Sequence, residues 1–362
     1  MSMFPQPPPG QGPIHPGAGA PSPYPPMMPP MPYPPVPPEP RSGGGWVRAI
    51  FVTLATTIFG LSLTLNIYLL IYTGLMRGGM GGSVTSVVRD GKVDQTIAVV
   101  PIRGIITQQT FEQFARWMNA IEEDSRIKGL ILEVDTPGGE VAPSDQIHQR
   151  IVDLKKKRGI PVVVSMGGYA TSGGYYVSAP ADHIVAQPTT WTGSIGVRLD
   201  RLNISRLADK YGIEDNSLHA TGSDFKTAGS IWKPETPEER AYLLGLVDDA
   251  YRIFTEVVQK GRGSKLTAPM NVIASGKVFT AMEASKLGLV DQVGYFDDAV
   301  DKAIALANLN QPRVIRYSRP PSLWESLGVE SAEGIARNAL HWDRSVLDEL
   351  LRPRLMYHWN GS

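Results

Sequence analysis

Ser172 is the residue whose type and surroundings most clearly suggest chemistry. It lies within Gly167–Tyr176, a run of mostly small residues that directly follows the apolar stretch Pro161–Met166. The β-branched residues of that stretch predict a buried strand, and the glycines after it allow a sharp turn that a second backbone can approach closely. A serine nucleophile is presented at such a strand-to-helix turn, where a following backbone N–H can point at a developing oxyanion. Glycine–serine turns are also common as purely structural features, so the local residues alone leave that alternative open.

A nucleophilic serine needs a general base, and the sequence offers histidines and lysines. None of the histidines after residue 77 lies in a recognisable base motif: His148, His183, His219, His341 and His358. His183 has the pattern of a residue at the edge of a strand. A lysine can act as a base where burial lowers its pKa from about 10.4 toward about 7–8. Lys226 fits by its surroundings, because residues 220–229 are small or apolar apart from the single acid Asp224. Spacing alone does not separate Lys226 from an ordinary solvated surface lysine.

The elements that must position these residues alternate between strand-like and helix-like patterns from Thr96 onward. This alternation is typical of a layered α/β domain. We expect strands at Ile97–Ile106, Gly129–Val134, Pro161–Met166, His183–Ala186 and Gly193–Val197. We expect helices after a capping box formed by Thr110 and Gln113, and over Ser144–Lys157, Thr236–Gln259, Thr280–Leu287 and Asp297–Ala307. The apolar stripe of the longest helix predicts a core or subunit-interface face: Leu243, Leu246, Ala250, Ile253 and Val257.

From Ile97 to about Ala305 the chain resembles the signal peptide peptidase A family of membrane-anchored serine–lysine proteases. Five blocks carry the resemblance in the same order: Asp135–Gly139, Ala170–Tyr176, Thr192–Val197, Phe225-Lys226, and Gly276–Phe279 with Leu287–Asp291. The chain departs from the usual family pattern at Lys277, where arginine is common, and at Ala281, where glycine is frequent. The resemblance implies a crotonase/Clp-protease-like α/β fold that follows one N-terminal transmembrane helix.

The resemblance also assigns roles to individual residues. It implies Ser172 as the nucleophile, Lys226 as the general base and Ser194 as the hydroxyl that holds the lysine amine. It implies the backbone N–H groups of Gly139 and Gly173 as the oxyanion donors. In related Clp proteases a histidine base follows the nucleophile by some two dozen residues, whereas that neighbourhood here contains no histidine, which favours lysine. Single-unit family members imply a ring-like homo-oligomer in which Ser172 of one subunit meets Lys226 of its neighbour.

The N-terminal part of the chain has a different composition. Of the 31 prolines, 18 lie in the first 40 residues, a segment with Glu39 as its one charged residue, which predicts a disordered tail. An uncharged stretch, Ala49–Met76, follows; as a helix it would reach about 42 Å, more than the ~30 Å hydrocarbon core, which predicts a membrane span. Positive charges flank both ends and do not decide its orientation. The expected domains are a Pro-rich tail (1–45), a transmembrane helix (46–77), a linker (78–95), the protease domain (96–317) and a C-terminal extension (318–362).

Composition excludes several classes of function. The chain has no cysteine, which rules out disulfides, thiol catalysis and cysteine metal sites. The formal net charge of zero argues against a nucleic-acid surface. We expect no cofactor and no metal.

The sequence and the resemblance together predict a single-pass membrane serine endopeptidase with an extracytoplasmic protease domain. Its predicted substrates are hydrophobic peptides, the remnants of signal peptides. Two alternatives remain: a related serine–lysine protease that processes one specific membrane protein, such as a stomatin-like partner, and a non-catalytic oligomeric scaffold at the membrane.

Overall fold

The computed structural model describes residues 45–79, 84–319 and 354–358, and the chain divides into two units at Ile67/Tyr68. Helix α1 (Gly45–Gly79) is the described part of the first unit and continues past the boundary. It contains one stretch, Gly45–Leu70, that is long and apolar enough to cross a membrane. The helix expected over 46–77 is therefore present, whereas the tail expected over 1–45 lies outside the described residues apart from Gly45.

The second unit is built on a mixed sheet. Its strands are β1 (Val84–Arg89), β2 (Lys92–Arg103), β3 (Ile127–Thr136), β5 (Val162–Thr171), β6 (His183–Ala186), β7 (Trp191–Gly193), β9 (Val278–Thr280), β10 (Gln292–Val293) and β11 (Pro312–Ser318). The order is β1-β11-β2-β3-β5-β6-β10, with β7 beside the end of β5 and β9 beside β7. A second, three-stranded sheet has the order β4-β12-β8 and consists of β4 (Gly138–Glu140), β8 (Arg198–Asp200) and β12 (Arg354–His358).

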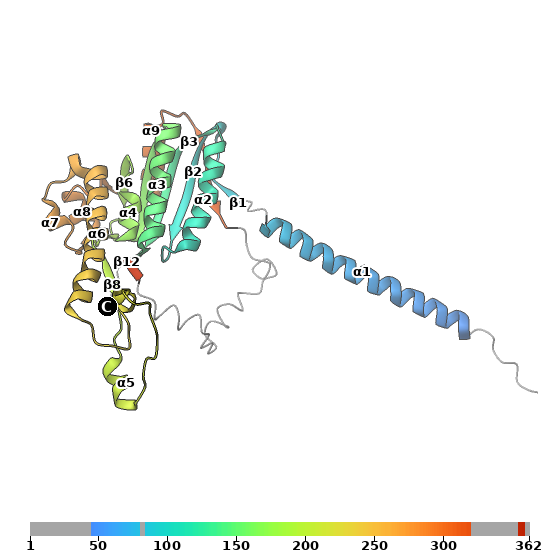
Figure 1. The fold of residues 1–362 in the computed structure, drawn as a ribbon. Coiled ribbons are helices and arrows are strands. Elements are labelled where there is room, and N and C mark those ends of the chain that lie inside the picture. Colours follow the sequence, from blue (N-terminus) through green and yellow to red (C-terminus); the bar gives the residue numbers. More distant parts are fainter. Residues whose placement is uncertain (1–44, 80–83, 320–353, 359–362) are drawn as a thin grey trace, which may run out of the picture. The chain divides into compact units, whose positions relative to one another are not determined.

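The longer helices of this unit follow the alternation that the sequence predicts, whereas several short helical segments were not predicted. The helices and 3₁₀ turns are α2 (Gln108–Glu123), α3 (Val141–Arg158), α4 (Gly173–Ser178), α5 (Ser205–Tyr211), η1 (Asp224–Thr227), α6 (Pro237–Arg262), η2 (Gly263–Lys265), α7 (Met270–Ile273), α8 (Ala281–Lys286) and α9 (Phe296–Leu306). In Figure 1, α2 and α3 lie against one face of the sheet. The expected α/β class is confirmed.

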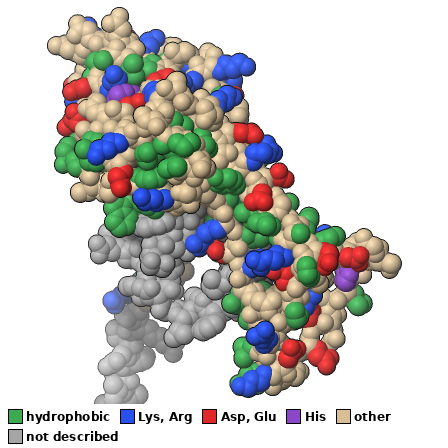
Figure 2. Space-filling model, turned by 90° about the vertical axis from the view of Figure 1, so that its left-hand side faces the viewer, with side chains coloured by type: hydrophobic (Ala, Val, Ile, Leu, Met, Phe, Trp, Pro, Cys, Tyr) green, Lys and Arg blue, Asp and Glu red, His purple; other side chains and the backbone are tan. Residues whose placement is uncertain are grey.

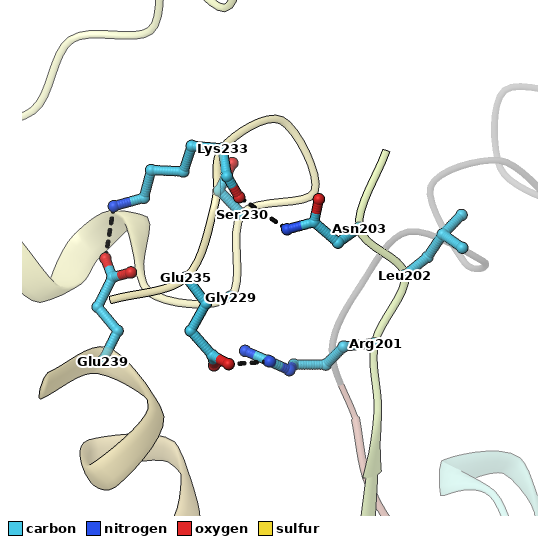
Figure 3. A pocket seen from close by; sticks show the side chains of 8 residues that line it. All are labelled: Arg201, Leu202, Asn203, Gly229, Ser230, Lys233, Glu235 and Glu239. Atoms are coloured by element: carbon cyan, nitrogen blue, oxygen red, sulfur yellow. Dashed lines mark hydrogen bonds and ion pairs between the residues drawn. The ribbon is translucent and has the colours of Figure 1, made fainter. Parts of the chain in front are cut away.

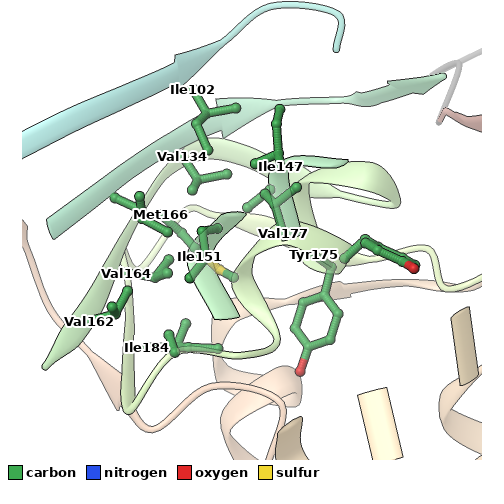
Figure 4. Packing of buried hydrophobic residues seen from close by; sticks show 14 of the residues in the cluster. Ile102, Val134, Ile147, Ile151, Val162, Val164, Met166, Tyr175, Val177 and Ile184 are labelled. Atoms are coloured by element: carbon green, nitrogen blue, oxygen red, sulfur yellow. The ribbon is translucent and has the colours of Figure 1, made fainter. Parts of the chain in front are cut away.

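Helices cover both faces of the central sheet, and alternate strand residues enter two separate cores. In β3, Leu130 and Leu132 pack toward α2, α3 and α4, whereas Ile131 packs toward α9. In β5 the same alternation separates Val164 from Val163. Figure 4 shows the first of these cores. Parallel strands that are buried on both faces read as continuous apolar runs, which is why the central strands stand out in the sequence.

The start of α2 and the end of β7 differ from the boundaries that the sequence predicts. The capping box expected at Thr110 and Gln113 is wrong: Thr107 is the N-cap of α2, and its N–H donates to Oγ1 of Thr110 at 3.2 Å. The strand expected over Gly193–Val197 ends at Gly193, because Ser194 has a positive φ of 50° that an extended strand does not tolerate.

The stretch expected to be a linker (78–95) contains β1 and the start of β2. Strand β1 pairs antiparallel with β11, with Val84 opposite Ser318. The β-branched residues of β1 suit a strand, and the glycines and serines before it obscured that signal. The expected linker is therefore part of the sheet from Val84 onward.

The apolar stripe expected on α6 coincides only in part with the face of the helix that is buried. In α6 the buried apolar residues are Ala250, Phe254 and Val258, whereas Leu246 and Ile253 are exposed. The stripe therefore enters the core in part, through Ala250 and Val257, and its exposed members are left for the expected interface alternative.

Candidate active site

Ser172 lies where β5 ends and α4 begins, which is the strand-to-helix turn that the sequence predicts. Its φ of 53° is unusual for a residue with a side chain. Two backbone hydrogen bonds hold the turn: the N–H of Ser172 donates to the Gly193 carbonyl at 2.7 Å, and its carbonyl accepts from the N–H of Tyr176 at 2.9 Å. Only 1% of Ser172 is exposed. Strained backbone of this kind presents the nucleophile in serine hydrolases.

The two glycines expected to supply oxyanion donors lie beside this turn. A Cβ built on Gly173 would lie 3.2 Å from the backbone nitrogen of Gly139, so the two N–H groups are close together. Gly139 allows no side chain, because its Cβ would collide with the carbonyl oxygen of Ile106. Ile106 flanks β4 through two hydrogen bonds, from its own N–H to the Gly138 carbonyl (2.9 Å) and from the Glu140 N–H to its carbonyl (2.8 Å). The loop that carries Gly139 is thereby fixed from one edge.

Thr136 fixes the same loop from within, a function that the sequence did not reveal. Its Oγ1 donates to the Gly104 carbonyl at 2.5 Å and accepts the Gly138 N–H at 3.0 Å. Gly138 has a φ of +101°, which favours glycine. The motif around Gly139 is thus held by a threonine hydroxyl as well as by a strand contact.

Ser194 lies beside Ser172, because the two serines directly follow the last paired residues of two neighbouring strands. Thr171 of β5 is paired with Gly193 of β7, so the two serines follow adjacent strand ends. Ser194 also has a positive φ, and its N–H donates to the Lys277 carbonyl at 2.8 Å. Both serines are buried at one edge of the sheet.

Lys226 lies elsewhere, in the short 3₁₀ turn η1, where it is exposed. Among the described residues, no hydrogen bond or ion pair joins its amine to either serine. One chain therefore brings together Ser172, Ser194, Gly139 and Gly173 but not Lys226. A single chain also does not provide the water-free surroundings that a lysine base requires.

We call residues 201–235, which carry Lys226, the arm. In Figure 1 the arm, with α5, extends away from the sheet. Polar contacts hold its base where it returns to α6 (Figure 3). Arg201 pairs with Glu235 at 2.6 Å, Lys233 pairs with Glu239 at 2.5 Å, and Asn203 donates to the Lys233 carbonyl at 2.7 Å. The hydrogen bond from Lys233 lowers the pKa of Glu239.

The arm and the start of α6 expose many large apolar side chains. They are Leu202, Leu207, Tyr211, Ile213, Leu218, Phe225, Trp232, Tyr242, Leu244 and Leu246. Figure 2 shows hydrophobic side chains exposed on one face of the molecule. A concentration of exposed apolar residues in one segment marks a surface for a partner.

Three of the candidate histidines, His148, His183 and His219, have no hydrogen bond to Ser172 in the part of the chain that the structure describes. His183 begins β6, at the opposite end of the sheet from Ser172, and its Nε2 lies 3.3 Å from Gln292 Oε1. His148 packs edge-on against Tyr176 at 5.3 Å, and burial lowers its pKa. His219 is exposed on the arm, and His341 lies outside the described residues. Within residues 45–79, 84–319 and 354–358, no three acidic or histidine side chains form a metal-binding group.

Comparisons with known proteins show that the chain is similar to proteases. The family model "Peptidase family S49" matches residues 154–310. A putative protease of Methanocaldococcus jannaschii is 38% identical over 216 residues, which is 59% of this chain and 68% of that protein. A putative signal peptide peptidase SppA of Enterococcus faecium is 33% identical over 290 residues, 75% of this chain and 83% of that protein. A solved structure titled "1510-N membrane-bound stomatin-specific protease" has a TM-score of 0.41 at 19% identity and covers 62% of this chain and 99% of its own.

Proposed function

The chain belongs to peptidase family S49, and from this premise we propose that it is a serine endopeptidase whose nucleophile is Ser172. The observation that carries the proposal is the strained, buried turn at Ser172 with two glycine N–H groups beside it. A nucleophile and preorganised backbone donors are the two parts that acyl transfer requires of a protein.

The proposed reaction proceeds through an acyl-enzyme. Ser172 Oγ attacks the carbonyl carbon of a bound peptide while its proton passes to the neutral amine of Lys226. The C–N bond then breaks, the ammonium returns the proton to the leaving amine, and an ester remains on Ser172. Water hydrolyses the ester with Lys226 again as the base, which releases a carboxylate and restores the serine.

The N–H groups of Gly139 and Gly173 stabilise the oxyanion in both steps. Loss of one such donor typically costs about 3–4 kcal/mol of transition-state stabilisation. Ser194 accepts a hydrogen bond from the lysine amine and so orients it. A hydroxyl can do this without stabilising the ammonium as a carboxylate would.

Lys226 comes from a second copy of the chain in this proposal. Two observations support it: the amine is exposed in a single chain, and the arm around it exposes a large set of apolar side chains. Contact between copies would bury these side chains and exclude water from the amine. Head-to-tail contacts of this kind close into rings when the rotation between copies allows.

We further propose that α1 anchors the enzyme in a membrane, with the protease domain on the extracytoplasmic side. The apolar stretch Gly45–Leu70 contains 26 residues with a mean hydropathy of 1.8. A helix of that length reaches ~39 Å, enough to span a hydrocarbon core of ~30 Å with some tilt. Signal peptides left in the membrane are hydrophobic and close to such an anchor. They are the proposed substrates, in line with the name of the Enterococcus faecium relative.

Matched variants of the full chain test the proposal. Ser172→Ala and Lys226→Ala should each abolish cleavage of a hydrophobic peptide, and Ser172→Ala should also abolish labelling by a fluorophosphonate probe. Ser275→Ala and Lys286→Ala, at exposed positions outside the arm, are the controls and should retain activity. Lys226→Arg should be inactive too, since arginine stays protonated. Full activity in either purified dyad variant would refute the mechanism.

The substrate class has its own test. Cells that carry Ser172→Ala should accumulate many signal-peptide fragments. If one uncut membrane protein accumulates and the fragments do not, the enzyme processes a specific partner and does not digest signal peptides in general.

A further inference from the structure

The strand that leads to the proposed nucleophile contains a bulge. Pairing between β3 and β5 is regular up to Val134 and resumes at Thr136, which is opposite Ala170. Asp135 is therefore opposite three residues of β5, 167–169, so β5 carries two residues more than its neighbour at this point. Bulges are rare between parallel strands, and they are over-represented next to active sites, where they redirect a side chain.

The bulge sets how far Ser172 projects along the sheet. Because Ala170 is opposite Thr136, Ser172 follows at the level of the loop that carries Gly139. A Cβ built on Gly173 would lie 3.2 Å from the Gly139 nitrogen, which shows how closely the two segments meet. A strand rises about 3.3 Å per residue, so without the two extra residues Ser172 would lie about 7 Å farther along. The bulge is thus the feature that brings the serine level with the proposed oxyanion donors.

The side chain of Asp135 holds the bulge in place. Its Oδ1 accepts the N–H of Tyr169 at 3.1 Å, whereas its backbone carbonyl accepts from the Gly104 N–H of the other neighbouring segment at 3.1 Å. A Cβ built on Gly167 would lie 2.9 Å from the carboxyl carbon of Asp135, and one on Gly168 would lie 3.7 Å from Oδ1. The carboxylate therefore packs over both glycines and replaces a backbone acceptor of the sheet.

Thr190 holds the bulge from the other edge of β5. It is fully buried, and its Oγ1 donates to the Gly167 carbonyl at 2.6 Å. One side chain on each edge thus pairs with a backbone group of the bulge. An unpaired backbone group inside a protein costs free energy comparable to a lost hydrogen bond, so loss of either side chain favours a rearranged bulge.

We infer that Asp135 is a positioning residue for the nucleophile: its carboxylate fixes residues 167–169 and thereby sets the place of Ser172 relative to the Gly139 loop. The inference rests on the proposed function, because it takes Ser172 as the nucleophile. Only two residues separate the bulge from Ser172, so a shift of the bulge moves the serine hydroxyl. A misplacement of about 1 Å can cost on the order of 100-fold in rate.

Peptide cleavage by variants of the full chain tests the inference. Asp135→Ala removes the acceptor, so kcat should fall at least about tenfold while KM changes less than about threefold. Asp135→Asn keeps a carbonyl oxygen that can accept the Tyr169 N–H, so its kcat should stay within about threefold of that of the unchanged chain. An unchanged kcat in Asp135→Ala, an effect confined to KM, or an equal loss of kcat in both variants would overturn the inference.

Asp298→Ala is the matched control for a loss of stability. The Asp298 carboxylate also accepts one backbone N–H, that of Tyr295 at 2.7 Å, but it lies at the start of α9, which packs on the other face of the sheet from α2 and α3. Asp298→Ala should therefore keep its kcat. A fall in its kcat as large as that in Asp135→Ala would overturn the inference. If the unchanged chain cuts no peptide, the proposed function fails instead.

Amide hydrogen exchange tests the contact without catalysis. In chains that also carry Ser172→Ala, residues 167–171 should exchange at least about tenfold faster with Asp135→Ala than with Asp135→Asn, because the Tyr169 N–H has lost its acceptor. Equal exchange rates in the two chains would overturn the claim that the Asp135 side chain fixes the bulge, whether or not the enzyme is active.

Discussion

The edge of the sheet around Ser172 and the arm around Lys226 are built in opposite ways. At the sheet edge, Ser172 and Ser194 are buried, and backbone hydrogen bonds fix both turns. On the arm, Lys226 is exposed, and the fixed contacts lie only at the base, around Arg201 and Lys233. The nucleophilic half of the proposed site is thus complete within one chain, whereas the half that carries the base is not.

Under the proposed mechanism, this contrast keeps the enzyme inactive until copies of the chain assemble. A serine without a base is a poor nucleophile, and an exposed lysine is a poor base. If contact between copies provides both proximity and exclusion of water, the two halves become active together.

The largest expected effect is on the sheet edge. In Gly139→Ala, the new methyl group meets the Ile106 carbonyl, so β4 must shift and its N–H must leave the oxyanion position. We expect kcat to fall at least ~100-fold. Gly245→Ala, on an open face of α6, is the control and should retain activity. Activity of Gly139→Ala close to wild type would remove Gly139 from the proposed oxyanion site.

The next effect concerns the stability of the domain that holds this edge. Arg262 is completely buried, and it donates to Asp291 at 2.7 and 3.0 Å and to the Gly288 carbonyl at 2.8 Å. Arg262→Met removes two hydrogen bonds from the partly buried Asp291 carboxylate, which keeps those from Lys265 and the Ile184 N–H, and the free energy of unfolding in urea should fall by about 3 kcal/mol. Arg252→Ala breaks exposed pairs with Glu256 and Asp249 and should change the free energy of unfolding by less than about 1 kcal/mol. Equal losses in the two variants would contradict the account.

The same ion pair predicts a pH dependence. Burial alone would raise the pKa of Asp291, but hydrogen bonds from Arg262 and Lys265 lower it from 3.8 to about 2. Because the folded-state pKa lies below the unfolded one, this stabilisation is complete above about pH 4 and is lost as the pH falls toward 2. It is worth on the order of 2 kcal/mol. Between about pH 5 and pH 2, the free energy of unfolding in urea should decline less in Arg262→Met than in the unchanged chain. An identical decline in the two chains would contradict the assignment of this pH dependence to Asp291.

The smallest effect is expected on the arm. Leu218 is 98% exposed, so Leu218→Asp should leave the folding of one chain unchanged. If the arm contacts a second copy, the same substitution should weaken self-association by about tenfold in sedimentation experiments. Val272→Asp, at an exposed position on α7, is the matched control. If the Leu218→Asp chain self-associates as strongly as the unchanged chain, Leu218 does not take part in the contact between copies.

What the sequence could predict follows the same division. The turn at Ser172 and the strands β2, β3, β5 and β6 depend on local patterns, and they were predicted. The bridge from Ile106 to β4 and the pairing of Tyr357 with Gly139 depend on residues far apart in the sequence, and no local pattern indicates them. Lys226 stood out only through the resemblance to a family, since its own spacing is that of a surface lysine.

The helix α6 shows a second limit. Its start matches the expected Thr236–Gln259, and there Thr236 and Glu239 form a capping box around Pro237. Its buried face was predicted only in part, since Ala250 enters the core as expected but Phe254 does so in place of Ile253. Several apolar stripes on one helix compete, and only tertiary packing selects among them.

Complementation between inactive variants tests most directly whether the site is completed across copies. Chains that carry Ser172→Ala and chains that carry Lys226→Ala are each expected to be inactive, and they are mixed at equal amounts under conditions that allow exchange. A head-to-tail contact should pair an intact serine with an intact lysine at about a quarter of the contacts and restore about that share of wild-type activity. If the mixture stays as inactive as its components although the copies demonstrably exchange, the two residues do not act across a contact between chains.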